Sequence, residues 1–93
     1  MKNKNFNTKA IHVGNKPDEE TGAVTSPLHL SSTFKQKEVG VHKGYDYSRA
    51  GNPTRERFEN NISSLEDASY GIAFSSGMAA ITALFQTMGS GDH

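Results

Sequence analysis

Residues 70–88 read YGIAFSSGMAAITALFQTM, and this stretch decides the fold because a strand pattern, a turn and a helix pattern follow one another in it. Residues 70–74 form a short apolar run with turn-forming residues on either side, which predicts a buried strand. The Ser-Ser-Gly sequence at residues 75–77 predicts a sharp connection out of that strand. Apolar side chains then recur at helical spacing until two glycines stop the pattern, which predicts a helix over residues 78–88: Met78, Ile81, Leu84, Phe85 and Met88, followed by Gly89 and Gly91.

A second helix pattern lies just upstream of this stretch. The sequence Asn-Pro-Thr at residues 52–54 is typical of a helix start, and Thr54 is predicted as the N-cap. The apolar residues Phe58, Ile62 and Leu65 then recur at the spacing of an amphipathic helix. Charged and amide side chains occupy the other faces. This pattern predicts a helix of about three turns that ends near Asp67. The order helix–strand–helix indicates an α/β fold.

Residues 1–53 lack such periodicity and hold all three prolines and five of the nine glycines. We predict mostly extended chain and loop there, with one short helix near residues 7–12. A segment of this length without regular structure is typical of a functional arm or of a clasp around another chain. We therefore divide the chain into an N-terminal arm, residues 1–53, and the start of an α/β domain, residues 54–93.

The composition excludes several classes of protein. The chain has 93 residues with ten basic and ten acidic side chains, so its formal charge is zero. Nucleic acids and anionic membranes are bound by clustered positive charge, so we expect neither as a partner. Cysteine is absent, which excludes thiolate metal sites, and the four histidines are too scattered to predict a metal site. The first ten residues lack an apolar stretch, so we expect no secretory signal and a cytoplasmic location.

Residues 68–91 contain no formally charged side chain. Serine, threonine, glutamine and glycine interrupt this stretch, so we do not expect it to span a membrane. An uncharged stretch of this length has to pack against other residues. The chain offers few large apolar side chains for this, because Leu, Ile, Val and Phe make up only 17 of the 93 residues. We therefore expect the chain to be a piece of something larger, or a protomer that partners complete.

Two local features could bind an anion. Gly77 follows the predicted strand and opens the last helix, so free backbone N–H groups there could hold a phosphate. The alternative is that Ser76 is only an N-cap and Gly77 only a packing glycine. Tyr47 and Arg49 are two residues apart, so on an extended segment they would share one face and suit a phosphate or carboxylate. Here the alternative is a solvated arginine beside a packed tyrosine.

The order and spacing of these features resemble a known family. The sequence Tyr-Ser-Arg-x-Gly-Asn-Pro-Thr at 47–54, followed by Ser-Gly-Met-Ala-Ala at 76–80, is similar to the N-terminal part of the Cys/Met-metabolism pyridoxal-phosphate enzymes. This family includes cystathionine γ-lyase, γ-synthase and β-lyase and methionine γ-lyase. The similarity runs in unbroken order from Asn7 to Asp92.

The resemblance implies a fold and a role for each motif residue. It implies the large domain of the aspartate-aminotransferase-like type (fold type I), with pyridoxal 5′-phosphate as the cofactor. It implies that Tyr47 and Arg49 reach the cofactor phosphate of a neighbouring subunit, while Gly77 and Met78 give backbone N–H groups to the phosphate in their own subunit. It further implies a homo-oligomer, a dimer of dimers, and a sulfur-containing or O-acylated amino acid as substrate.

The resemblance also implies that this segment holds no catalytic residue. In the family, the lysine that carries the cofactor as a Schiff base lies downstream of the part matched here, so we expect it beyond His93. All seven lysines of this chain lie in the polar arm, and none has the apolar surroundings that would make it nucleophilic. We therefore expect a fragment of a longer enzyme that is inactive by itself.

The residues between Ser48 and Pro53 look more like those of cystathionine γ-lyase or γ-synthase than like those of other members. Methionine γ-lyase, cystathionine β-lyase, an O-acylhomoserine sulfhydrylase and a truncated, non-catalytic interaction module stay open as alternatives.

Overall fold

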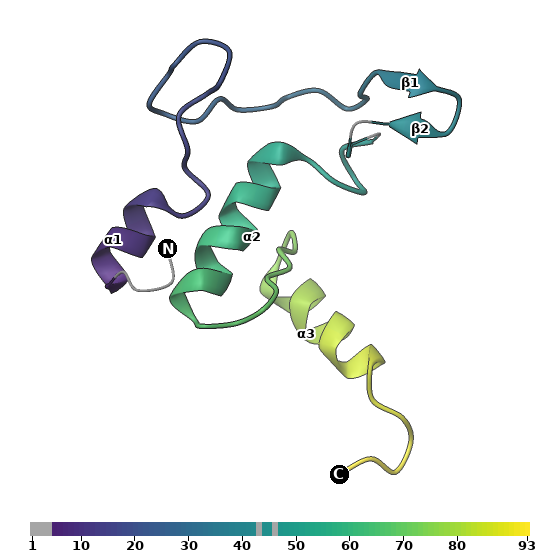
Figure 1. Cartoon of the computed structure of the whole chain (residues 1–93). Coiled ribbons are helices and arrows are strands. Elements are labelled where there is room, and N and C mark those ends of the chain that lie inside the picture. Colours follow the sequence, from purple (N-terminus) through teal and green to yellow (C-terminus); the bar gives the residue numbers. More distant parts are fainter. Residues whose placement is uncertain (1–4, 43, 46) are drawn as a thin grey trace.

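The computed structural model describes residues 5–42, 44–45 and 47–93 of the chain. Three helices and one small hairpin follow in chain order (Figure 1): α1 Phe6–His12, β1 Gln36–Glu38, β2 Val41–His42, α2 Pro53–Leu65 and α3 Gly77–Gln86. The short helix predicted near residues 7–12 is confirmed as α1, whose N-terminus is capped because the Asn5 side chain accepts from the Thr8 N–H at 3.0 Å.

Helix α2 is the element to which most of the chain is attached. The sequence predicts Thr54 as its N-cap, and this prediction is wrong. The cap is Asn52, whose Oδ1 accepts from the Thr54 N–H at 2.9 Å. The reason is Pro53, which lacks an N–H and has a fixed φ, so it suits the first position inside the helix. The helix ends at Leu65, two residues before the predicted end, because Asp67 adopts a left-handed φ of 52°.

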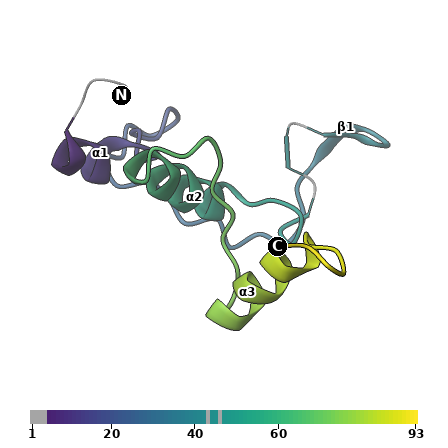
Figure 2. The same cartoon turned by 90° about the horizontal axis from the view of Figure 1, so that it is seen from below.

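The first part of the arm packs on α2 of its own chain, with α1 beside α2 in both views of the fold (Figures 1 and 2). Asn61 makes the main link, because its Nδ2 lies 3.2, 3.1 and 2.9 Å from the carbonyl oxygens of Lys9, Ala10 and Val13. These carbonyls belong to the last turn and the cap of α1; that of Lys9 also accepts from the Val13 N–H at 3.1 Å, whereas the last carbonyls of a helix generally lack a partner inside the helix. The amide of Asn61 therefore caps the C-terminus of α1.

Two further side chains on α2 continue this attachment toward its N-terminus. Arg57 donates from Nη1 to the Pro27 carbonyl at 2.6 Å, and the Thr54 hydroxyl accepts from the His29 N–H at 2.7 Å. Gly14 lets the chain approach closely, since a Cβ there would lie 2.5 Å from the Arg57 carbonyl oxygen and its φ is +79°. The arm is thus held by hydrogen bonds to its backbone rather than by an apolar core.

The hairpin β1–β2 was not expected from the sequence. Its strands have three and two residues and pair antiparallel, and Gly40 turns between them with a φ of +81°. An isolated bridge between Thr33 and Tyr47 closes the loop beneath the hairpin. Strands this short have no readable alternation of apolar and polar residues, so the pattern could not reveal them.

The strand predicted at residues 70–74 does not form. This run has no regular secondary structure: a strand needs a hydrogen-bonded neighbour, and the only sheet among the described residues pairs β1 with β2. The run is instead attached to α2, because the Ala73 N–H donates to the Glu59 carboxylate at 2.7 Å. Tyr70 and Ile72 are 87% and 74% exposed, so the prediction of a buried strand is wrong for this chain.

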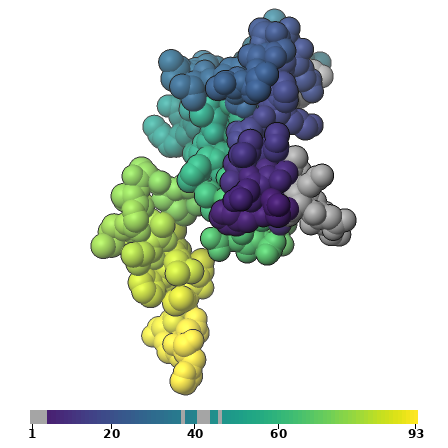
Figure 3. Space-filling model, turned by 90° about the vertical axis from the view of Figure 1, so that its left-hand side faces the viewer, coloured from purple at the N-terminus to yellow at the C-terminus, as the bar shows by residue number. Residues whose placement is uncertain are grey.

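The last predicted helix is present but shorter. It spans Gly77–Gln86 rather than residues 78–88, with Thr87 as its C-cap. It contacts no other described helix or strand, and it projects with the C-terminal tail from the rest of the molecule (Figure 3). Its apolar side chains and those around it are exposed: Phe74, Met78, Ile81, Leu84, Phe85 and Met88.

The described part of the chain has no apolar core. None of its hydrophobic side chains is buried, and Asn52, 8% exposed, is its one buried residue. The radius of gyration is 16.4 Å, whereas a compact domain of this length would have about 12 Å. The expected cover for the uncharged stretch is therefore not supplied by these residues. None of the described helices is long and apolar enough to cross a membrane.

Candidate functional site

The N-terminus of α3 has open hydrogen-bond donors, as the sequence predicts. Ser76 is the N-cap: its Oγ accepts from the Ala79 N–H at 3.1 Å, and its carbonyl accepts from the Ala80 N–H at 3.2 Å. The N–H groups of Gly77 and Met78 have no acceptor among the described residues. A Cβ on Gly77 would meet nothing within 4 Å. Gly77 is therefore not a packing glycine within this chain, and the space beside its N–H is open to an anion.

The second predicted feature, Tyr47 with Arg49, has a different geometry from the one expected. Residues 47–51 form a turn, in which the Tyr47 carbonyl accepts from the N–H groups of both Ala50 and Gly51 at 3.0 Å. The two side chains therefore do not share the face of an extended segment. They meet by stacking instead, because the Arg49 guanidinium carbon lies 5.4 Å from the centre of the Tyr47 ring.

Arg49 is exposed, and none of the ion pairs among the described residues involves it. The single ion pair among the described residues joins Lys9 to Asp67 at 3.3 Å and lies elsewhere. An exposed guanidinium stacked on a phenol ring is a suitable ligand for phosphate oxygens. The two features thus fit the phosphate group of the implied cofactor: two open N–H groups and one exposed guanidinium with several donors.

The 47–51 turn is held by two side chains from the first turn of α2 and its cap, which the sequence analysis did not single out. Asn52 donates from Nδ2 to the Ser48 hydroxyl at 3.1 Å, and Arg55 donates to the Ala50 carbonyl at 3.1 Å. The signal that could have identified Asn52 is Pro53, because a proline at the first helical position makes the residue before it the cap.

Tyr45 ties the chain before the turn to the same helix end. Its hydroxyl donates to the carboxylate of Glu56, and its ring lies 5.7 Å from that of Phe34. The hydrogen bond to Glu56, with partial burial and the negative charge of Glu56, raises the pKa of Tyr45 to about 12. Tyr45 therefore stays a neutral donor at physiological pH.

The two halves of the candidate site do not meet in this chain. No hydrogen bond or ion pair among the described residues joins Arg49 to Gly77 or Met78. The turn is fixed to the N-terminal end of α2, whereas α3 leads away from that helix (Figures 1 and 2). Each half is therefore formed by contacts within its own part of the chain.

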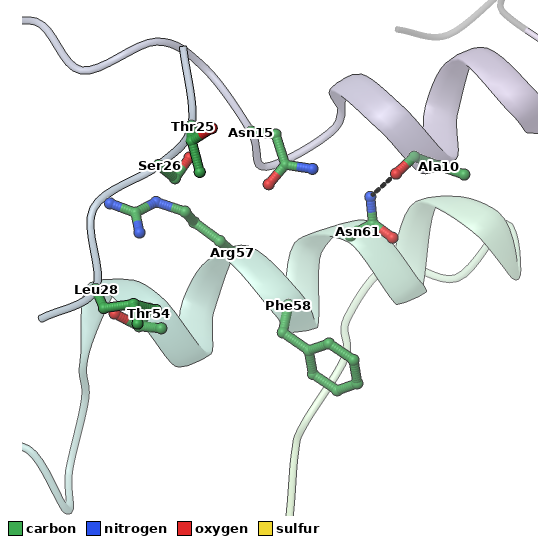
Figure 4. A pocket seen from close by; sticks show the side chains of 9 residues that line it. All are labelled: Ala10, Asn15, Thr25, Ser26, Leu28, Thr54, Arg57, Phe58 and Asn61. Carbon is green, nitrogen blue, oxygen red and sulfur yellow. Dashed lines mark hydrogen bonds between the residues drawn. The ribbon is translucent and has the colours of Figure 1, made fainter. Parts of the chain in front are cut away.

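The hollow between the arm and α2 is not part of this site (Figure 4). It has a volume of about 360 Å³, and Arg57 and Asn61 lie along it. Both donate to backbone carbonyls of the arm, so their donors are already used for packing. Among the described residues, no group of three or more His, Asp or Glu side chains could hold a metal ion.

Comparisons with known proteins agree with the resemblance of the motifs. Residues 7–93 match the family described as Cys/Met metabolism PLP-dependent enzyme. The chain is 47% identical over 92 residues to a cystathionine beta-lyase of Coxiella burnetii, covering 99% of this chain and 24% of that protein. It is 52% identical over 86 residues to a cystathionine gamma-lyase of Bacillus subtilis, covering 92% and 23%.

Solved structures give the same result. The crystal structure of metB from Corynebacterium glutamicum superimposes with a TM-score of 0.92 at 44% identity, over 98% of this chain and 24% of that one. The cystathionine gamma-lyase from yeast follows with a TM-score of 0.88 at 44% identity, over 100% and 24%. The chain thus spans about a quarter of the length of these relatives. It belongs to the Cys/Met metabolism family of PLP-dependent enzymes.

Proposed function

We propose that the chain is the N-terminal part of a pyridoxal-phosphate-dependent lyase or γ-replacement enzyme that acts on sulfur amino acids. Its relatives include proteins named cystathionine gamma-lyase, cystathionine beta-lyase and probable cystathionine gamma-synthase. Within this range we favour cystathionine γ-lyase or γ-synthase. A methionine gamma lyase of Micromonospora echinospora, 37% identical, also has this fold. Each relative named here is an enzyme, so nothing favours the alternative of a non-catalytic module. The cytoplasm stays the expected location.

The observation that carries the proposal is the pair of open N–H groups at Gly77 and Met78. A phosphate accepts well from such groups because they are the unsatisfied donors at the positive end of a helix. The absence of a Cβ at residue 77 lets phosphate oxygens come close to the backbone. When bound, the cofactor supplies an electron sink for reactions at the α- and β-carbons of the substrate. The part of this segment is to hold and orient the phosphate end of the cofactor.

We further propose that Tyr47 and Arg49 serve the phosphate of a neighbouring subunit in a dimer of dimers. In support, both residues lie on a turn fixed to α2, and no described hydrogen bond joins Arg49 to the α3 N-terminus of its own chain. The arm of residues 1–53 would then have two parts. The first packs on α2, and the hairpin with the 47–51 turn reaches the neighbour.

The proposal is tested by cofactor binding to the complete protein after removal of its cofactor. We expect Arg49→Ala to bind pyridoxal phosphate with about 10- to 150-fold higher Kd, since a hydrogen bond to a charged group contributes about 1.5–3 kcal/mol. The Kd for pyridoxal, which has no phosphate, should stay unchanged. Lys16→Ala, which removes an exposed cation of the arm, is the matched control and should change neither value. An Arg49→Ala protein that binds pyridoxal phosphate like the wild type would contradict the proposal.

A further inference from the structure

We propose that Asn52 and Arg55 are positioning residues for the phosphate ligand Arg49, an inference that rests on the proposed function. Neither side chain is expected to touch the cofactor. They hold the 47–51 turn against the N-terminus of α2, and this fixes the backbone from which Arg49 extends.

Asn52 uses both ends of its side-chain amide in three contacts. Its Nδ2 donates to the Ser48 hydroxyl and to the His29 carbonyl, both at 3.1 Å, while its Oδ1 caps α2 through the Thr54 N–H. It joins three segments of the chain: the arm at His29, the turn at Ser48 and the start of α2. It is also the one buried residue of the described chain, so water competes little for these bonds.

Arg55 holds the turn from the other side. Its Nη1 lies 3.4 Å from the carbonyl oxygen of Arg49 and its Nη2 lies 3.1 Å from that of Ala50. The guanidinium is planar, so two donors in one plane fix the orientation of these neighbouring carbonyls. The backbone of Arg49 itself is therefore one of the groups that Arg55 holds.

The need for such positioning comes from the freedom of Arg49. An arginine side chain has many rotamers, and this freedom is lost when it binds a ligand. Arg49 is exposed, and its described side-chain contact is the stack on Tyr47. If the turn also moved, more freedom would be lost on binding and affinity would fall. Fixing the backbone before the ligand arrives removes that part of the loss.

The test separates positioning from simple stability by comparing two asparagines: Asn52, the N-cap of α2, and Asn61, inside that helix. Asn52→Ser keeps a capping oxygen for the Thr54 N–H but shortens the side chain, so the bonds from Nδ2 to Ser48 and His29 are lost. Asn52→Asp keeps the cap and also loses both donors. Asn61→Ser is the matched control, since Asn61 donates to α1 and makes no contact with the turn. Arg55→Met removes the second support without touching the cap.

The measurements are the Kd of the complete, cofactor-free protein for pyridoxal phosphate and for pyridoxal, with the thermal midpoint of unfolding. We expect Asn52→Ser, Asn52→Asp and Arg55→Met to raise the Kd for pyridoxal phosphate about tenfold, while the Kd for pyridoxal changes by less than about twofold. A tenfold change corresponds to the contribution of about one hydrogen bond. Asn61→Ser should lower the midpoint and leave the ratio of the two Kd values as in the wild type.

The proposal is overturned if Asn52→Ser and Arg55→Met leave the ratio of the two Kd values unchanged, or if Asn61→Ser alters it to the same extent. Arg49→Ala in the same assay distinguishes a failure of the positioning role from a failure of the proposed phosphate site. If Arg49→Ala raises the ratio and the Asn52 and Arg55 variants do not, only the positioning role is wrong. If Arg49→Ala has no effect, the proposed phosphate site is wrong as well.

Discussion

Replacing Gly77 with alanine should separate cofactor binding from folding. In this chain a Cβ on Gly77 meets nothing within 4 Å, and the φ of Gly77 is not in the left-handed region. Alanine should therefore be tolerated there, and it should even stabilise the protein by about 0.4–1 kcal/mol, because it restricts the unfolded chain. If the proposed phosphate site is right, however, the new methyl group should hinder the approach of the phosphate to the N–H groups of Gly77 and Met78.

The expected loss of affinity follows from the hydrogen bonds at stake. Displacing a phosphate from one backbone donor costs about 1.5–3 kcal/mol, which is about a 10- to 150-fold rise in Kd for pyridoxal phosphate. The assay is titration of the complete, cofactor-free protein with pyridoxal phosphate, followed by its visible absorption, together with the thermal midpoint without cofactor.

Gly71→Ala is the matched control, six residues earlier. A Cβ on Gly71 would lie 2.5 Å from the Glu59 carbonyl oxygen of α2, so the run must shift. We expect it to destabilise the protein by about 1–3 kcal/mol through overpacking, with little direct effect on the phosphate. The reasoning is refuted if Gly77→Ala binds the cofactor as tightly as the wild type, or if it lowers the cofactor-free midpoint as much as Gly71→Ala does.

Three further predictions concern the contacts around α2. Asn61→Ala should destabilise the complete protein by about 1–2 kcal/mol and increase hydrogen exchange in α1, since the Lys9, Ala10 and Val13 carbonyls lose the contact with the Asn61 amide; unchanged exchange would argue against the cap. The folded-state pKa of Tyr45 is about 12, above its ordinary value of about 10, so its stabilising effect should be complete below about pH 10 and be lost as the pH rises through 12. Denaturant unfolding of Tyr45→Phe should then show a shallower alkaline loss of stability than the wild type, and equal slopes would count against the Tyr45–Glu56 bond. At a cofactor concentration too low to activate Arg49→Ala, mixing this variant with a variant of the expected downstream Schiff-base lysine should restore about a quarter of wild-type activity if Arg49 acts on the neighbouring subunit; mixed dimers without activity would place it in its own subunit.

The two long helices could be predicted from the sequence because their apolar residues recur over several turns. Their ends were less predictable, since single residues decide them: Pro53 moves the cap of α2 from Thr54 to Asn52, and Asp67 ends that helix through its backbone conformation. The hairpin was missed because two or three residues per strand carry no pattern.

The strand predicted at residues 70–74 is a different case. Its apolar run is typical of a buried position, but these residues are not buried in this chain. A buried strand needs hydrogen-bonded strands beside it and other elements packed on both faces of the sheet. The described residues supply neither for residues 70–74. The candidate site likewise has one part that could be predicted from the local sequence and one part that could not. The cap and open donors of α3 follow from Ser76 and Gly77 alone, whereas the turn around Arg49 depends on Asn52 and Arg55, whose contacts no local pattern reveals.

The central claim is that this segment binds the phosphate of pyridoxal phosphate, and a structure of the complete protein with the cofactor bound tests it most directly. We expect phosphate oxygens within hydrogen-bond distance of the Gly77 and Met78 N–H groups of one subunit and of the Arg49 guanidinium of its neighbour. A phosphate bound away from the N-terminus of α3, with Arg49 in solvent, would contradict it.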